Sequence, residues 1–304
     1  MKLSEAFEEF LLDRIASGAT DKTIADYRQK IRIFRTYAKE DLPVDQIDLN
    51  FCRMYYVYLR DRGISSVTIQ AYIRNLRAFL NWLYLNDYIK TDICHRFRLP
   101  KAQRKYIDIL TDAEIRKIFD ALAGDRWVDA RNRVIIMLML DCGLRLNEVV
   151  TARLAYLHLR EKYIIVDGKG QKQRAVPFGR TLEHSIRQYL DQTADFETLI
   201  ISGCRDGRQK RPPEPVTYEA VKDLFRILKE KTGIARLHPH LLRHTFATRY
   251  LENGGNIYAL QMILGHTQLT MCQKYLHLAQ SKVVSGFINF SPVDRLKEEG
   301  SDTP

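Results

Sequence analysis

Apolar side chains recur at helical spacing throughout residues 1–100. In the opening stretch they fall at Leu3, Phe7, Leu11 and Ile15, which places them on one face of a helix. The same spacing continues through residues 24–38 and 69–83, and glycine or proline residues separate the stretches. The pattern predicts a first domain, residues 1–100, that consists of helices only.

The pattern changes after Pro100. A polar linker is predicted at residues 101–108, because a capping box at residues 111–114 then opens a helix. Strand-forming runs on either side of a glycine-containing turn at 168–172 predict a hairpin. Further helices are predicted near residues 112–123, 130–141, 181–192 and 217–231. We therefore expect a second domain at 109–282 and a tail at 283–304, in a mainly α fold with a small antiparallel sheet (α+β).

The charge balance favours a polyanionic partner. The formal net charge is +11 and the pI is about 9.4, so nucleic acid is the first partner to consider. A basic protein without such a partner is the alternative, because charge alone does not identify a ligand. The 45% of hydrophobic residues is ordinary for a globular chain of this length.

The cysteines and the apolar runs narrow the class of protein further. Five cysteines lie far apart with no CxxC pair, which argues against a disulfide framework and a zinc site. The chain opens with no basic leader before an apolar run, and its longest apolar run, residues 134–140, is too short to span a bilayer. We expect a cytoplasmic protein with no membrane partner.

Two cations in the second domain stand where a phosphate could be bound. Arg145 follows a glycine turn, and its planar guanidinium could take two oxygens of one phosphate, oriented by Glu148. Lys169 stands between two glycines at the hairpin tip, where it could protonate a leaving oxygen. Each has an alternative, a surface ion pair for Arg145 and a solubilising turn lysine for Lys169.

A second group of cations opens a predicted helix at Pro239. His240 and Arg243 are three residues apart in the first turn, so the spacing predicts that they share a face at the positive end of the helix dipole. A metal site that uses His238, His240 and His244 is the alternative. No carboxylate lies near them and the local arginine would repel a metal ion, so we expect no metal, and we expect His244 to pack or bond locally.

His266 and Tyr275 complete the candidate chemistry. His266 follows Gly265 at the end of a predicted helix, and Tyr275 lies on the next short helical stretch. A phenol attacks a phosphate only where surrounding cations favour its ionisation and stabilise the pentavalent phosphorane. For any single tyrosine a packing role is the commoner alternative.

The order and spacing of these residues resemble those of the tyrosine recombinases of the phage integrase family, and the layout of the chain is similar to that of Xer-like members. In that family the first arginine ends a motif that matches residues 142–145 and is followed by the equivalent of Glu148. Cys142 stands where the family usually has threonine. The resemblance implies six catalytic residues: Arg145, Lys169, His240, Arg243, His266 and Tyr275.

The resemblance implies a SAM-like core-binding domain followed by a catalytic domain, which together form a C-shaped clamp around duplex DNA. DNA contacts are then expected from the first domain and the linker. The candidates are Thr68, Arg74, Arg77, Lys101 and Arg104.

The implied reaction is a transesterification that forms a 3′-phosphotyrosine at Tyr275 and needs neither cofactor nor metal. In it Arg145 and Arg243 hold the non-bridging oxygens and His266 donates a further hydrogen bond. Lys169 protonates the departing 5′-oxygen, and His240 helps to accept the tyrosine proton. Four protomers, with or without a paralogue, exchange strands through a Holliday junction, and the tail docks on a neighbouring protomer or packs on its own domain.

The biological role stays open at this point. The chain begins at once with core-binding helices and its tail differs from that of housekeeping Xer proteins, so we expect integration, excision or inversion of a mobile element, on DNA in the nucleoid. A type IB topoisomerase shares the chemistry and is the nearest competing function. A DNA-binding regulator without catalysis and a metal-dependent hydrolase are two more distant ones.

Overall fold

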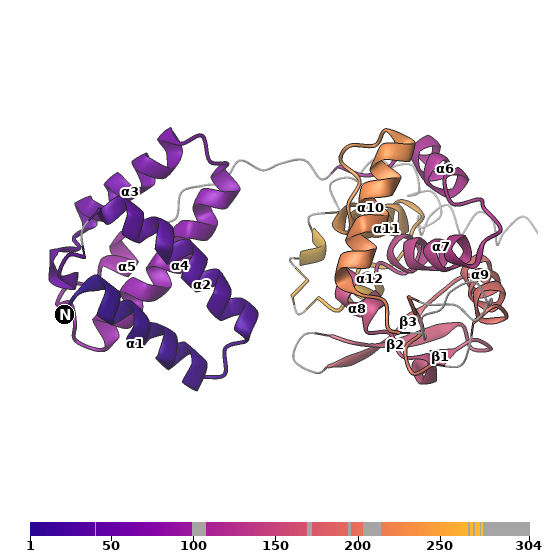
Figure 1. Ribbon diagram of the computed structural model, residues 1–304, viewed down its shortest axis with the longest axis horizontal. Coiled ribbons are helices and arrows are strands. Elements are labelled where there is room, and N and C mark those ends of the chain that lie inside the picture. The colour runs from indigo at the N-terminus through magenta and orange to yellow at the C-terminus, as the bar shows by residue number, and fades with distance from the viewer. Residues whose placement is uncertain are drawn as a thin grey trace, which may run out of the picture. The chain divides into compact units, whose positions relative to one another are not determined.

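The computed structural model describes residues 1–39, 41–98, 108–168, 172–193, 196–202, 214–266, 268–269, 271–273 and 275 (Figure 1). The chain divides into two compact units, Met1–Lys105 and Tyr106–Pro304. The first is helical and the second combines helices with one small antiparallel sheet, so the predicted fold class is confirmed. No described helix is long and apolar enough to cross a membrane.

The first unit contains five α-helices among its described residues. They are α1 (Leu3–Ala16), α2 (Asp21–Ala38), α3 (Leu49–Asp61), α4 (Ser66–Leu85) and the short α5 (Ile93–Arg96), with a 3₁₀ turn, η1, at Val44–Gln46. Side chains of Thr20, Asp48 and Ser65 accept the backbone N–H three residues on, which fixes where α2, α3 and α4 begin.

Helix α4 is the centre of the first unit, because it packs against each of the other four helices. Its buried face meets α1 in an aromatic cluster, where Phe10 lies edge-on to Phe79 and Trp82. These rings are almost fully buried. Burial of such large aromatic side chains contributes strongly to the stability of a helical unit.

The second unit holds the remaining described elements. The helices are α6 (Asp112–Asp120), α7 (Trp127–Leu140), α8 (Leu146–Val150), α9 (Arg180–Leu190), α10 (Tyr218–Thr232), α11 (Pro239–Glu252) and α12 (Ile257–Leu264). A 3₁₀ turn, η2, lies at Leu154–Tyr156, and the strands are β1 (Leu157–His158), β2 (Tyr163–Asp167) and β3 (Gln173–Pro177). The predicted capping box is confirmed, since Thr111 and Glu114 bond each other's backbone N–H at the start of α6.

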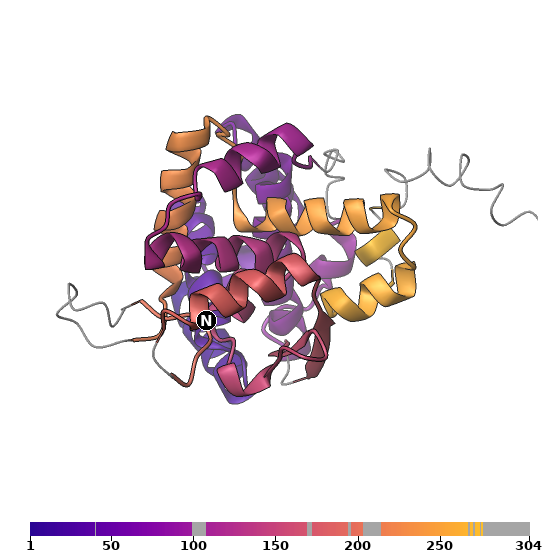
Figure 2. The ribbon, with the colours of Figure 1, turned by 90° about the vertical axis from the view of Figure 1, so that its right-hand side faces the viewer.

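The predicted hairpin is also confirmed. Strands β2 and β3 pair antiparallel, with Ile164 opposite Val176, and the two-residue strand β1 adds a third strand that the sequence did not predict. Ile164, Val166 and Val176 are buried, as the period-2 alternation of a strand requires. Helix α7 packs between α9 and α11 (Figure 2).

Candidate active site

Arg145 lies immediately before α8 and binds Glu148 twice. Its backbone N–H donates to Glu148 Oε2 and its Nη1 donates to Oε1, both at 2.8 Å. The preceding Gly143 has a φ of +64°, and a β-carbon there would lie 2.5 Å from the Phe246 ring. The turn that delivers Arg145 therefore needs glycine for its backbone conformation and for space.

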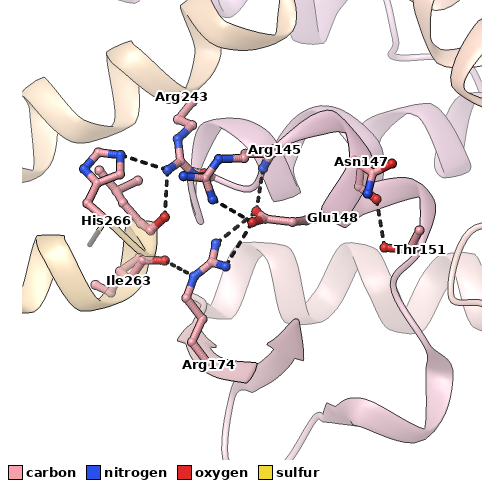
Figure 3. Close-up of polar contacts among 10 residues, drawn as sticks. Arg145, Asn147, Glu148, Thr151, Arg174, Arg243, Ile263 and His266 are labelled. Carbon is pink, nitrogen blue, oxygen red and sulfur yellow. Dashed lines mark hydrogen bonds and ion pairs between the residues drawn. The ribbon is translucent and has the colours of Figure 1, made fainter. Parts of the chain in front are cut away.

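Glu148 is buried, with 4% of its surface exposed, and receives a second guanidinium. Arg174 on β3 donates from Nη1 to Oε1 and from Nη2 to Oε2, both at 2.9 Å (Figure 3). The two oxygens thus accept four hydrogen bonds, which uses the whole acceptor capacity of a carboxylate. Burial acts to raise the pKa of Glu148, but the bonds from Arg174 and Arg145 outweigh it and lower the pKa below its usual value.

Sequence reasoning missed Arg174, although a signal for it exists. Arg174 and Val176 are two residues apart on one strand, so they point to the same face of the sheet, and Val176 faces the core. A cation on the buried face of a strand needs a buried anion as partner. Applied to the predicted hairpin, that argument predicts a buried carboxylate partner for Arg174, although it does not identify Glu148 as that partner.

Arg243 is buried in the first turns of α11 and is held by backbone carbonyls. Nη1 donates to the carbonyl of Gly143, and Nη2 donates to the carbonyl of Leu264 at 2.7 Å. Burial, followed by the like charge of Arg145, lowers the pKa of Arg243 to about 10. The guanidinium remains charged at neutral pH, and an added anion would stabilise it.

His266 follows the C-terminal end of α12 and lies beside Arg243. Its Nε2 is 3.2 Å from Arg243 Nη2, and its Nδ1 is 3.1 Å from Cys272 Sγ. Because a guanidinium only donates, Nε2 accepts in this contact and Nδ1 carries the hydrogen toward the sulfur. Gly265, with a φ of +62°, ends the helix in the left-handed conformation and so sets the direction of this segment.

Tyr275 is buried, with 1% of its surface exposed, and its hydroxyl is 2.7 Å from His244 Nδ1. Its ring belongs to a small hydrophobic cluster with α11 and α12. Burial raises the pKa of Tyr275 to about 12, although the charges of Arg243 and Arg145 act to lower it. The expected ionisation of the phenol by surrounding cations is therefore not achieved here, because desolvation is the larger effect.

His240 and Arg243 differ more than their spacing predicted. Helix α11 begins at Pro239 as expected, but His240 is exposed whereas Arg243 is buried beneath the helix. The two side chains therefore do not share one environment, because His240 is exposed to solvent and Arg243 lies in the interior. The structure brings together Arg145, Arg243, His266 and, through its charge interactions, Tyr275, while Lys169 lies outside the described residues.

The candidate DNA contacts of α4 also differ from one another. Thr68 and Arg74 are exposed, and Thr68 Oγ1 is 2.8 Å from Ser65 Oγ at the start of the helix. Arg77 is half-buried and donates from Nε to the carbonyl of Cys94 at 3.0 Å. Lys101 and Arg104 lie outside the described residues.

No group of three histidine, cysteine or carboxylate side chains suited to a metal gathers within the part of the chain that the structure describes. The polar cluster instead collects cations, since Arg145 and Arg174 bind one carboxylate, Glu148, and Arg243 lies beside His266 in the same cluster (Figure 3). Such a cluster carries excess positive charge and suits an anion of the phosphate class.

Two family profiles match the chain. The Phage integrase family matches residues 108–282, more than half of the chain, and the Phage integrase SAM-like domain matches residues 2–99. Among curated proteins, the chain is 28% identical to the tyrosine recombinase XerD of Oceanobacillus iheyensis over 95% of this chain and 97% of that protein. It is also 28% identical to the tyrosine recombinase XerC of Staphylococcus carnosus, over 98% and 99% of the two chains.

Solved structures share the fold. The Tn1549 transposon integrase in complex with a circular intermediate DNA matches with a TM-score of 0.73 at 20% identity, over 94% of this chain and 99% of that one. A lambda integrase fragment, solved as a dimer bound to a COC′ core site, matches with a TM-score of 0.74 at 20% identity, over 90% and 95% of the two chains.

Proposed function

The chain belongs to the phage integrase family and is a tyrosine recombinase, and on this premise we propose that it cleaves and rejoins duplex DNA through a covalent 3′-phosphotyrosine at Tyr275. The observation that carries the proposal is a cluster of three arginines around one carboxylate: Arg145 and Arg174 bind Glu148, and the charges of Arg145 and Glu148 act on Arg243. The excess positive charge of this cluster is what a scissile phosphate would neutralise.

We assign the phosphate contacts to Arg145 and Arg243. Arg145 is the more open of the two, with 35% of its side chain exposed, and Arg243 is fixed in the interior by two carbonyls. A rigid guanidinium of this kind stabilises charge that develops in the transition state without further reorganisation. His266 would donate to the same phosphate once Nε2 carries a proton, and Lys169 would protonate the departing 5′-oxygen.

The nucleophile requires a change of surroundings before it can attack. With its hydroxyl on His244 Nδ1 and its ring buried, Tyr275 is sheltered from solvent. A neutral phenol with a pKa near 12 is also a poor nucleophile at neutral pH. We propose that DNA binding uncovers Tyr275 and that His240, exposed at the start of α11, then helps to accept its proton.

DNA recognition is assigned to both parts of the chain. Thr68 and Arg74 present exposed groups on α4, while Arg77 is partly occupied by the carbonyl of Cys94. Lys101 and Arg104 belong to the proposed linker at 101–108, between domains at 1–100 and 109–282. The net charge of +11 supports a polyanionic ligand of this kind.

At the level of assembly we propose four copies on DNA, with or without a paralogue, that exchange strands through a Holliday junction during integration, excision or inversion of a mobile element. The tail at 283–304 would dock on a neighbouring copy. Truncation after residue 282 should then reduce recombination more than cleavage of one isolated site.

The test of the proposed function is to lyse expressing cells in denaturant, recover the protein and sequence any DNA that stays covalently attached. We expect adducts at one or two sites, absent from Tyr275→Phe and retained in Tyr250→Phe, a control from the same hydrophobic cluster. Attachment sites at the ends of an element or at inverted repeats support the mobile-element role, and a single chromosomal site with no element or repeat beside it contradicts that role.

The competing functions give different outcomes in the same experiment. Adducts scattered over many sequences, together with relaxation of any supercoiled plasmid, indicate a type IB topoisomerase. Specific DNA binding without adducts, even on substrates nicked to prevent religation, indicates a regulator without catalysis. Cleavage that stops in excess chelator indicates a metal-dependent hydrolase.

A further inference from the structure

We propose that Arg174 is a positioning residue of the cleavage reaction, which fixes Arg145 through Glu148 and at the same time fixes the segment that carries His266. The inference rests on the proposed function. Arg174 links three chain segments far apart in sequence, since it lies on β3 and contacts α8 and α12. Figure 3 shows its guanidinium between Glu148 and the carbonyl of Ile263.

The first contact of Arg174 determines the orientation of Arg145. The Arg174 fork holds both oxygens of Glu148 at 2.9 Å, and the same two oxygens receive the backbone N–H and Nη1 of Arg145. A carboxylate that accepted only from Arg145 could turn about its side-chain bonds. The fork removes this freedom, because planar bidentate pairing fixes both the position and the plane of the carboxylate.

The second contact completes the C-terminal end of α12. The last four carbonyls of a helix have no partner within it. Here those of residues 261 and 262 accept the N–H groups of His266 and Gly265, both at 3.1 Å. The carbonyl of Ile263 accepts from Arg174 Nε, and that of Leu264 accepts from Arg243 Nη2, both at 2.7 Å.

All four carbonyls are therefore occupied, two of them by arginines. His266 follows directly, so this arrangement sets where its imidazole lies. Cations at a helix C-terminus also interact favourably with the helix dipole.

The packing around Gly265 shows how closely Arg174 fits. A β-carbon at Gly265 would lie 3.0 Å from Cδ and 3.1 Å from Cζ and Nε of Arg174. Only 11% of the Arg174 side chain is exposed, and each of its three nitrogens is hydrogen-bonded to protein. We therefore expect Arg174 to affect the reaction through the groups that it holds and not by contact with the DNA. Lysine has one nitrogen on a flexible stem and cannot make the three contacts together.

The test compares Arg174→Lys with Arg236→Lys in the full chain. Arg236 is a matched control because it too binds both oxygens of one carboxylate, Glu114, and a backbone carbonyl, that of Ile109. The substrate is the DNA recovered as adducts, nicked beside the cleavage point so that religation cannot occur. The measurements are the rate of covalent complex formation in a single turnover and the Kd for DNA.

We expect Arg174→Lys to slow covalent complex formation about 100-fold, since small displacements of catalytic groups have effects of this size. DNA binding should change less than about threefold, and the control less than about twofold in both measurements. Equal losses of binding and cleavage, or no loss of either, would overturn the inference. In an Arg145→Lys background the further loss should be less than about tenfold, and full multiplication of the two effects would show that Arg174 does not act through Arg145.

Amide hydrogen exchange tests the inference on the protein alone, with no DNA added. Amides of residues 261–266 should exchange about 10-fold faster in Arg174→Lys than in the wild type, with other segments unchanged. Unchanged exchange at 261–266, or a uniform increase throughout the second unit, would contradict a local positioning role. A wild-type chain that forms no covalent complex would refute the proposed function, whereas the exchange result would still decide what Arg174 holds in place.

Discussion

Two arginine–carboxylate pairs of the second unit share one geometry and differ in their surroundings. Arg174 binds both oxygens of Glu148, and Arg236 binds both oxygens of Glu114. The side chains of the first pair are 11% and 4% exposed, whereas those of the second are 39% and 20% exposed. The first carboxylate also holds Arg145, while the second caps the start of α6.

The difference shows that bidentate geometry alone does not define a role. The exposed Arg236–Glu114 pair is screened by solvent and contributes modestly to stability. The buried pair keeps its charge only because several donors compensate for the lost hydration, and one of those donors belongs to the proposed reaction. Loss of the Glu148 charge should therefore affect chemistry and folding together, and changes to the exposed pair should affect neither strongly.

The largest expected effect is at Arg145, the donor that distinguishes the two carboxylates. Arg145→Lys should slow covalent complex formation about 1000-fold, because a point charge cannot replace a fork that stabilises the transition state. DNA binding should be nearly unchanged, since Arg145 would supply only one of the proposed phosphate contacts. Single-turnover cleavage and a binding titration measure the two quantities, and near-normal cleavage by this variant would refute the assigned role.

The next largest expected effect is a difference in the free energy of unfolding between variants of the two carboxylates. Glu148→Gln leaves the largely buried Arg174 without its anion and should cost about 3–5 kcal/mol, whereas Glu114→Gln should cost less than about 1 kcal/mol. Urea unfolding followed by Trp127 fluorescence, in a Trp82→Phe background, reports on the second unit because these are the two tryptophans of the chain. Equal costs for the two variants would mean that burial does not distinguish the pairs.

Much of this arrangement could be predicted from the sequence, and the limits have physical causes. The helical first unit, the capping box at Thr111 and the hairpin follow from local periodicity, and all three are present. The three-residue spacing of Arg145 and Glu148 likewise indicates their contact. Contacts between distant segments do not follow from local patterns, so the bond from Arg174 to the carbonyl of Ile263 was not predicted.

The same limit applies to charge and burial. The sequence predicted that cations would favour ionisation of Tyr275, but desolvation raises its pKa to about 12. The loss of hydration depends on packing of the ring among α11 and α12, which residue spacing does not define. For the same reason the burial of Arg243 beside an exposed His240 could not be inferred from positions three residues apart.

At low pH, stability should depend on the exposed Arg236–Glu114 pair, and this effect should be smaller than those of the substitutions above. Donation from Arg236 lowers the pKa of Glu114 from 4.5 to about 2. The unfolded chain then takes up this proton at higher pH than the folded chain, so the stability that Glu114 contributes is present above pH 4.5 and is lost as the pH falls toward 2.

Glu114→Gln should therefore flatten the decline of stability in that window, by less than about 1 kcal/mol. Trp127 fluorescence during urea unfolding at each pH measures it. A decline as steep as in the wild type would place the acid sensitivity elsewhere, with Glu148 the next candidate because its pKa is lowered too.

The smallest expected effect concerns two arginines of the first unit, one exposed and one hydrogen-bonded to the backbone. Arg74 is exposed on α4, whereas Arg77 donates to the carbonyl of Cys94 at 3.0 Å. Arg74→Ala should weaken DNA binding at all sequences and reduce the salt slope by about one, as the loss of one phosphate contact does. Arg77→Ala should mainly lower the stability of the first unit, by about 1 kcal/mol for the lost hydrogen bond. Titrations of both variants at several salt concentrations test this, and the reverse pattern would assign the DNA contact to Arg77.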